Sequence, residues 1–240
     1  MQVKLIAHTQ VSEEFLKSLS IELLNIKNTD GQMVALTAIR TCYSSNKPSE
    51  IVHLEGGKYF GSAATDGQAG SDADRLIRHI VKSGHTSTLE HISFTFALEG
   101  VSRSLLAQLT RHRHLSFSVQ SQRYVKFGSG DKSGGFDYTV PTTVKEKGKV
   151  DVYVEIMSEL QSKYDKLRSL GIPAEDARYI LPNSATTNLV MTGNLRTLLD
   201  FYSKRASNQA QWEIRELAEH IKDAVINVEP WTEPFFKVGD

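Results

Sequence analysis

Three things are scarce in this chain of 240 residues: cysteine, unbroken apolar sequence and net charge. The single cysteine, Cys42, excludes an internal disulfide framework and a metal site built from several cysteines. No apolar run is long enough to span a bilayer, and the N-terminal MQVKLIAHTQ lacks the apolar core of a signal peptide, so we expect a cytoplasmic protein. Lys+Arg and Asp+Glu both number 28, and this neutrality argues against general nucleic-acid binding through the overall charge.

Familiar phosphate and metal motifs are also missing. Neither GxGxxG nor GxxxxGK[ST] occurs, and the glycine-rich GSGDKSGG at 128–135 precedes no clear helix, which indicates a turn. The Arg-His-Arg-His run at 111–114 does not suit a metal, because arginines repel a cation and no carboxylate lies nearby in sequence. His85 and His91 are six residues apart, which is not the i, i+4 spacing of a helical zinc pair. We predict no metal site.

The remaining composition is that of an ordinary globular protein, with 40% hydrophobic and 23% charged residues, and we expect one domain over residues 1–240. Strand patterns cover residues 2–8, 91–99 and 185–192. Helical patterns cover residues 12–24, 33–43, 71–84, about 146–170, 173–180, 194–204 and 209–228, and another helix begins after Ser102. Gly100 is expected to end the strand before it. The segment Ser71–Asp74 resembles a capping box, and the Ser- and Gln-rich sequence after residue 113 indicates a loop. Residues 44–70, rich in Gly and Ser, predict a long surface loop. This mixture indicates an α/β (α+β) fold, a mixed sheet with flanking helices.

Charge is uneven in one place, because residues 100–130 contain no Asp or Glu. The cations of this stretch are Arg103, Arg111, Arg113, Arg123 and Lys126, with His112 and His114. Small hydrogen-bonding side chains lie between them, namely Gln108, Ser116, Ser118, Gln120, Ser121 and Gln122. Composition alone leaves a solvated surface loop as an equal alternative. The interleaved donors favour an anion site, since arginine binds phosphates and carboxylates in bidentate fashion.

Several sequence blocks together form a specific signature. Its centre is Arg111-His112-Arg113, seven residues, Ser121, and then Gln122-Arg123-Tyr124. Its setting is GHTSTLEH at 84–91, Gln108 before the triplet, RYILPN at 178–183, TGNLR at 192–196 and KRASNQAQWEI at 204–214. These blocks resemble the flavin-dependent thymidylate synthase family and follow the family's order over roughly residues 33–236. The segments 44–70 and 128–135 lie outside the match.

The resemblance implies an enzyme that converts dUMP to dTMP, with methylenetetrahydrofolate as carbon donor and NADPH-reduced FAD as hydride source. It also implies a homotetramer with active sites at subunit junctions, and small-molecule substrates rather than nucleic acid or membrane. The implied cofactor-binding residues are Ser87, Glu90, Arg111, His112, Arg113, Val119, Asn194, Leu195, Arg196 and Asp200. The implied dUMP-binding residues are Gln108, Arg111, Gln120, Ser121, Gln122, Arg123, Arg178 and Arg205. Arg205 matches the arginine that polarises the uracil ring. His85 is either a core histidine or a neighbour of the flavin.

Chemistry gives its own reason to expect a cation at the pyrimidine. Uracil C5 is a poor nucleophile, and one solution adds a cysteine thiolate at C6. The only thiol here belongs to Cys42, outside the arginine-rich stretch, and we expect it to be a buried structural residue. Without a thiolate, donors aimed at the carbonyl oxygens would stabilise the charge that develops on the ring. Ser121 has no evident base nearby and is assigned to binding.

Two positions depart from the family's pattern. Val119 stands where the family usually has Glu or Gln, and neighbouring Gln120 is a possible replacement. Asp200 stands where Asn or His is common, and a carboxylate near a flavin phosphate is unfavourable unless it is paired. Two rival functions remain: a module whose acid-free stretch binds nucleic-acid phosphates, and a divergent flavin reductase. The first predicts steeply salt-dependent affinity for polynucleotides.

Overall fold

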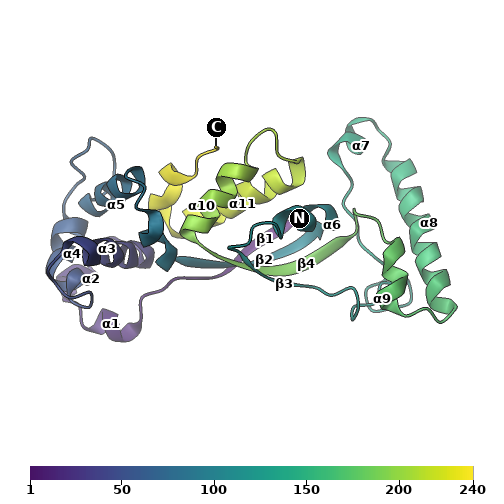
Figure 1. The fold of residues 1–240 in the computed structure, drawn as a ribbon, viewed down its shortest axis with the longest axis horizontal. Coiled ribbons are helices and arrows are strands. Elements are labelled where there is room, and N and C mark those ends of the chain that lie inside the picture. Colours follow the sequence, from purple (N-terminus) through teal and green to yellow (C-terminus); the bar gives the residue numbers. More distant parts are fainter. Residues whose placement is uncertain (240) are drawn as a thin grey trace. The chain divides into compact units, whose positions relative to one another are not determined.

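The computed structural model describes residues 1–239 and confirms the α/β (α+β) class. Its sheet has the strand order β1-β2-β4-β3 (Figure 1). The strands are β1 Gln2–His8, β2 Ser93–Ser102, β3 Ser116–Val119 and β4 Thr186–Asn194. Residues pair across β1–β2 and across β2–β4 in opposite sequence directions, so these neighbours run antiparallel. In β2, the alternating side chains Phe94, Phe96 and Leu98 are all buried, as the sequence pattern predicted.

The chain divides into two compact units. The first unit comprises residues 1–4 and 97–191, and the second comprises residues 5–96 and those from 192 on. The boundaries fall within β1, β2 and β4, so the single-domain organisation stays a prediction. No helix of residues 1–239 is both long and apolar enough to cross a membrane.

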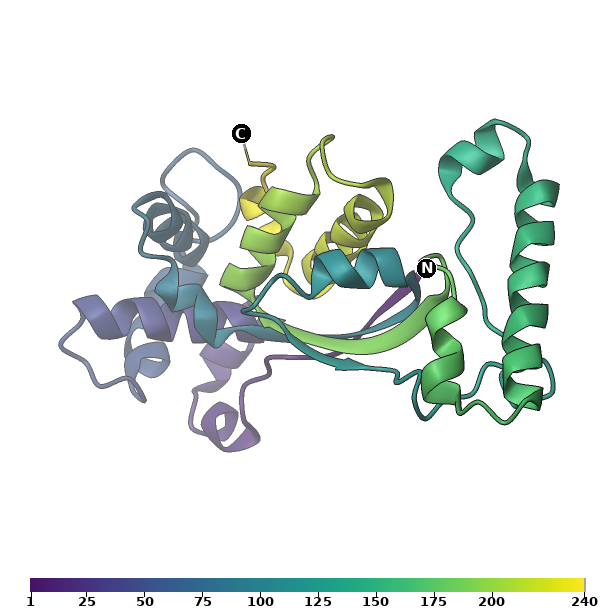
Figure 2. The same cartoon turned by 45° about the vertical axis from the view of Figure 1, so that its right-hand side comes forward.

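The first unit is built around a long helix. Its helical elements are α6 Arg103–Leu109, α7 Thr142–Glu146, α8 Val150–Ser169, α9 Ala174–Ala177 and the 3₁₀ helix η2 Arg178–Ile180. Figures 1 and 2 both show α9 beside α8, and the two helices contact each other. Tyr164 of α8 is fully buried among Phe127, Phe136 and Ala177, and its hydroxyl accepts the Phe127 N–H at 3.3 Å. The predicted helix at 146–170 is divided because Gly148 takes a positive φ of 62° between α7 and α8.

The second unit contains the helix α3 Asp30–Tyr43, which contacts the helices that span residues 51–61, 72–82 and 86–91. The other helical elements of the unit are α1 Glu13–Lys17, α2 Ile21–Leu24, α4 Ile51–Gly61, α5 Asp72–Lys82, η1 Thr86–His91, α10 Leu195–Arg205, α11 Trp212–Val228 and η3 Pro230–Phe235. The predicted capping box of α5 is present, with Ser71 and Asp74 bonding each other's backbone N–H. The single helix predicted at 12–24 is two helices, because Ser20 is the N-cap of α2 and its side chain accepts the Leu23 N–H.

The prediction of a surface loop over residues 44–70 is wrong, because α4 lies within it. Its glycines suggested a loop, yet Ile51, Val52, Tyr59 and Phe60 are buried on one side of the helix. Gly56 is a packing residue here, since a Cβ at that position would lie 3.0 Å from a methyl carbon of the α2 residue Leu23.

Two further expectations about strands are corrected. Gly100 does not end β2, which continues to Ser102. Gly100 has a φ of 68°, and its N–H donates to the side chain of Asn188 in β4, which keeps the two strands paired. The short strand β3 lies in sequence that predicted only a loop. Ser102 does cap α6, accepting the N–H of Leu105 at 3.0 Å.

Candidate active site

The first unit holds a group of three arginines around α9, which we call the arginine cluster: Arg103, Arg123 and Arg178. Arg123 Nε donates to the Glu175 carboxylate at 3.0 Å, although the two residues are 52 positions apart. Arg178 Nε donates to the backbone carbonyl of Glu175 at 2.9 Å. Glu175 therefore contacts two of the dUMP-binding arginines that the resemblance implies.

Arg103 is the member of this cluster that sequence reasoning did not assign to the site. It is half-buried, and its Nη2 donates to Oε1 of the buried Gln122 at 3.0 Å. Burial, together with the charge of Arg178, lowers the pKa of Arg103. A partly desolvated guanidinium beside a second cation is stabilised by an anion between them. The signal in the sequence was its place in the acid-free stretch.

Two arginines of the cluster, the exposed Arg123 and the half-buried Arg178, also lie over aromatic rings. The Arg123 guanidinium is 5.6 Å from the ring centroid of Tyr124, and that of Arg178 is 5.9 Å from Tyr179. Both tyrosines are about 80% exposed. These distances are within the range of cation–π contacts, which hold a guanidinium plane without using its N–H groups.

The Arg111-His112-Arg113 triplet follows α6 directly. Leu105 and Leu109 bury one side of that helix, so the chain leaves the core just before the triplet. Arg111 and Arg113 are exposed and form no ion pair with any residue of the described chain. Two cations left without counter-charges suit a phosphate-bearing ligand.

The other residues predicted for the nucleotide site of this unit lie in α6 and in the segment 119–122. Gln108 is half-buried, with its Nε2 donating to the Ser104 carbonyl at 3.4 Å. Val119 ends β3, and the Gln120 side chain accepts from Asn188 at 3.4 Å, so part of its hydrogen-bonding capacity is used within the protein. The Ser121 hydroxyl accepts the N–H of Arg123 at 3.2 Å and forms a local turn. This arrangement supports a binding role for Ser121.

In the second unit, η1 and α10 bring together residues that the resemblance implies for flavin binding. Arg196, in the first turn of α10, forms an ion pair with Glu90 of η1. Asn194 caps α10 by accepting the Thr197 N–H at 2.9 Å, and Leu195 is fully buried against η1, its N–H bonding the Ile92 carbonyl at 2.7 Å. Ser87 is exposed on η1. The GHTSTLEH and TGNLR segments are therefore neighbours.

Two residues of α10 bear on the predicted chemistry. Asp200 is paired with Lys204 at 2.8 Å, which supplies the counter-charge that a carboxylate near a phosphate needs. Arg205 is the last residue of α10 and is half-buried, while Glu213, in the first turn of α11, is 3% exposed. Both take part in interactions within the chain. A structural pairing of Arg205 with a carboxylate is therefore an alternative to the polarising role.

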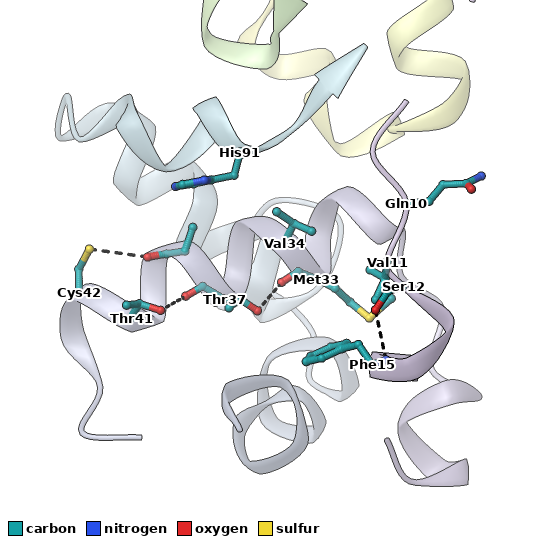
Figure 3. A pocket seen from close by; sticks show the side chains of 11 residues that line it. Gln10, Val11, Ser12, Phe15, Met33, Val34, Thr37, Thr41, Cys42 and His91 are labelled. Atoms are coloured by element: carbon teal, nitrogen blue, oxygen red, sulfur yellow. Dashed lines mark hydrogen bonds between the residues drawn. The ribbon is translucent and has the colours of Figure 1, made fainter. Parts of the chain in front are cut away.

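The expectation that Cys42 is a buried structural residue is wrong, because Cys42 is exposed in the last turn of α3. It lines an open, mainly apolar groove of about 610 Å³ within the second unit (Figure 3). The hydroxyls of Thr37 and Thr41 and the Cys42 thiol all donate to backbone carbonyls of α3, at 2.9, 2.7 and 3.6 Å. These polar atoms are thus turned toward the helix, which leaves the groove apolar. His91 lies at its edge.

His85 is not a core histidine. It is half-buried at the start of the GHTSTLEH segment, and its Nδ1 is 3.0 Å from the hydroxyl of Tyr43. The rings meet edge to face, with centroids 6.0 Å apart. Among the described residues, no group of three or more His, Cys, Asp or Glu side chains is placed to hold a metal ion.

Comparison with known proteins places this chain in a family. The family model for thymidylate synthase complementing proteins matches residues 23–231. The flavin-dependent thymidylate synthase of Geobacter sulfurreducens is 38% identical over 202 residues, covering 84% of this chain and 80% of that protein. That of Halobacterium salinarum is 39% identical over 196 residues, covering 72% of this chain and 79% of that protein. That of Clostridium tetani is 40% identical over 174 residues, covering 65% of this chain and 68% of that protein. The chain belongs to the flavin-dependent thymidylate synthase family.

Proposed function

We propose that the protein converts dUMP to dTMP, taking the carbon from methylenetetrahydrofolate and the hydride from FAD reduced by NADPH. Family membership supports the reaction. The observation that carries the nucleotide assignment is the arginine cluster, which has three guanidinium groups and a single carboxylate, that of Glu175. A phosphate monoester carries up to two negative charges, so it balances the cations that remain. The enzyme acts in the cytoplasm on small molecules, without nucleic acid.

In this proposal the arginine cluster binds the phosphate of dUMP. Arg123 and Arg178 present N–H groups of their guanidinium ends, and Arg103 adds a partly buried charge beneath them. Gln108, Gln120, Ser121 and Gln122 supply neutral hydrogen bonds around the nucleotide. A phosphate held by several cations in a partly desolvated place is bound more tightly than at a fully exposed surface.

The donor set suits FAD as well. Arg111 and Arg113 lack internal ion pairs and match the pyrophosphate of such a cofactor, with His112 between them. Ser87, Glu90, Asn194, Leu195 and Arg196 form a second binding segment, and pairing with Lys204 makes Asp200 tolerable there. Bound FAD, once reduced, supplies the hydride that turns the transferred carbon into a methyl group. Both segments act in a homotetramer, in which sites are completed by neighbouring subunits.

Activation of the pyrimidine falls to Arg205. Uracil C5 becomes nucleophilic when the ring gains electron density, and loss of the N3 proton to solvent places negative charge on N3 and the ring oxygens. A guanidinium beside these atoms stabilises the reactive ionised ring more than the neutral bound substrate, which raises turnover. No cysteine nucleophile is used, and the Cys42 thiol instead bonds the Ala38 carbonyl on the surface of α3.

The test is to purify the protein, record the flavin absorbance and quantify dTMP by chromatography in the complete mixture. We expect a flavin-loaded protein and dTMP that disappears when dUMP, methylenetetrahydrofolate or NADPH is left out, or when the bound flavin is removed from the protein beforehand. Reduction of the flavin without any dTMP would favour the divergent reductase. Salt-dependent binding of polynucleotides in place of both would favour the nucleic-acid module.

A further inference from the structure

The part of the arginine cluster that the proposed function does not explain is the acidic side chain at its centre. A carboxylate next to a phosphate site repels the ligand, so electrostatics alone disfavours Glu175 at this position. It lies in the first turn of α9, a helix that follows Pro173 and is anchored by the buried Ala174 and Ala177. The backbone that carries Glu175 is therefore held firmly in the core of the first unit.

The hydrogen bonds of Glu175 share one property. Arg123 and Arg178 both donate to this residue through Nε, the first to its carboxylate and the second to its backbone carbonyl. The Nη1 and Nη2 groups of both arginines form no hydrogen bond within residues 1–239. The Arg123 guanidinium lies over the Tyr124 ring, and that of Arg178 lies over the Tyr179 ring. Each guanidinium is thus fixed at its inner nitrogen while its two outer nitrogens remain for a ligand.

We propose that Glu175 is a positioning residue for phosphate binding: it fixes the two guanidinium groups through Nε so that their outer N–H groups face the same anion. This inference rests on the proposed function for the identity of the anion as the phosphate of dUMP. Immobilising a long side chain on binding costs about 0.5–1.5 kcal/mol, which is a factor of about 2 to 12 in affinity. Arg123, held only by the carboxylate, gains most from being fixed in advance.

Two variants separate positioning from charge. Glu175→Gln and Glu175→Ala remove the same negative charge, but only glutamine keeps a side-chain oxygen that accepts from Arg123 Nε. Asp176→Asn is the matched charge control, because Asp176 is the next residue of α9, is exposed and forms no ion pair with the described residues. All proteins are compared by circular dichroism and melting temperature before binding is measured.

The measurement is the Kd for dUMP and for inorganic phosphate by titration calorimetry, with KM and kcat for dUMP in the assay. Positioning predicts that Glu175→Ala binds both ligands about 2- to 12-fold more weakly than Glu175→Gln, with a raised KM and equal kcat. Equal affinity of these two variants would overturn the proposal, because charge alone would then account for Glu175. So would a failure of every protein to bind phosphate. If phosphate shows the predicted difference but dUMP is not bound, positioning stands and the proposed substrate fails.

Discussion

Gly31→Ala should destabilise this protein strongly, although alanine is the better helix former. Gly31 lies in the first turn of α3, and its N–H donates to the Glu229 carboxylate at 3.0 Å. A Cβ at Gly31 would be 2.5 Å from Glu229 Cδ and 2.6 Å from each carboxylate oxygen. Glu229 is 1% exposed and also accepts from Thr29 Oγ1 and Trp231 Nε1, so its carboxylate has a fixed place.

The magnitude follows from the hydrogen bonds that must break. Moving the carboxylate away leaves two or three buried donors poorly satisfied, at about 1–3 kcal/mol for each one lost. Replacing glycine by alanine within a helix returns about 0.5–1 kcal/mol. With two donors lost, the net effect is a loss of about 1–5 kcal/mol in the free energy of unfolding. Gly57→Ala in α4 is the control, since nothing lies within 4 Å of its added methyl, and it should stabilise the protein by about 0.5–1 kcal/mol.

Urea unfolding of wild type, Gly31→Ala, Glu229→Ala and the double variant measures the coupling. With the carboxylate removed, the alanine methyl has space, so Gly31→Ala should cost nothing in the Glu229→Ala background. Additive effects, or a Gly31→Ala protein as stable as wild type, would refute the packing described.

Burial also raises the pKa of the Glu229 carboxyl above its usual value, so the carboxyl loses its proton at a lower pH in the unfolded chain than in the folded protein. Stability should therefore fall as pH rises through the folded-state pKa, and Glu229→Gln should reduce that slope.

Cys42→Ser should keep most of the dTMP-forming activity, because the thiol lies on the surface of α3 and the proposed mechanism uses no thiolate. Loss of turnover in a folded, flavin-loaded variant would contradict this. Sedimentation should give a homotetramer that takes up FAD, whereas a flavin-free monomer at micromolar concentration would count against the assignment. Arg123→Ala should mainly weaken dUMP binding, seen as a raised KM, and a fall in kcat alone would argue against a phosphate role.

The periodic parts of the fold could be predicted from the sequence because their pattern is set by the core. The strict alternation in β2 and the capping box of α5 are examples. The helix α4 could not, since Gly56 serves close packing against Leu23, a contact between segments that composition does not reveal. Cys42 lies three residues after the buried Ile39, so helical spacing predicts that it is buried too. The last turn of α3 is exposed, however, and Cys42 with it.

The sequence could predict those features of the candidate site that depend on residues close together in the chain. The acid-free stretch predicted an anion site, and the resemblance implied which arginines would bind a nucleotide; both stay predictions. Glu175 could not be found in this way, because its pairing with Arg123 joins positions 52 residues apart and is created only by the placement of α9. Arg103 was visible as a charge, but its partial burial beside Gln122 required the folded chain.

The central claim is that a flavin-dependent reaction makes dTMP with an arginine, not a thiolate, activating the pyrimidine. The most direct measurement is dTMP formed by wild type and by Arg205→Ala at saturating dUMP, with FAD, NADPH and methylenetetrahydrofolate present. We predict turnover by wild type and a loss of about 100-fold or more in the variant, while NADPH still reduces its flavin at the wild-type rate. If Arg205 only formed a surface ion pair, its removal would lower the free energy of unfolding by less than about 1 kcal/mol. Equal turnover of the two proteins, or no dTMP from flavin-loaded wild type, would contradict the account.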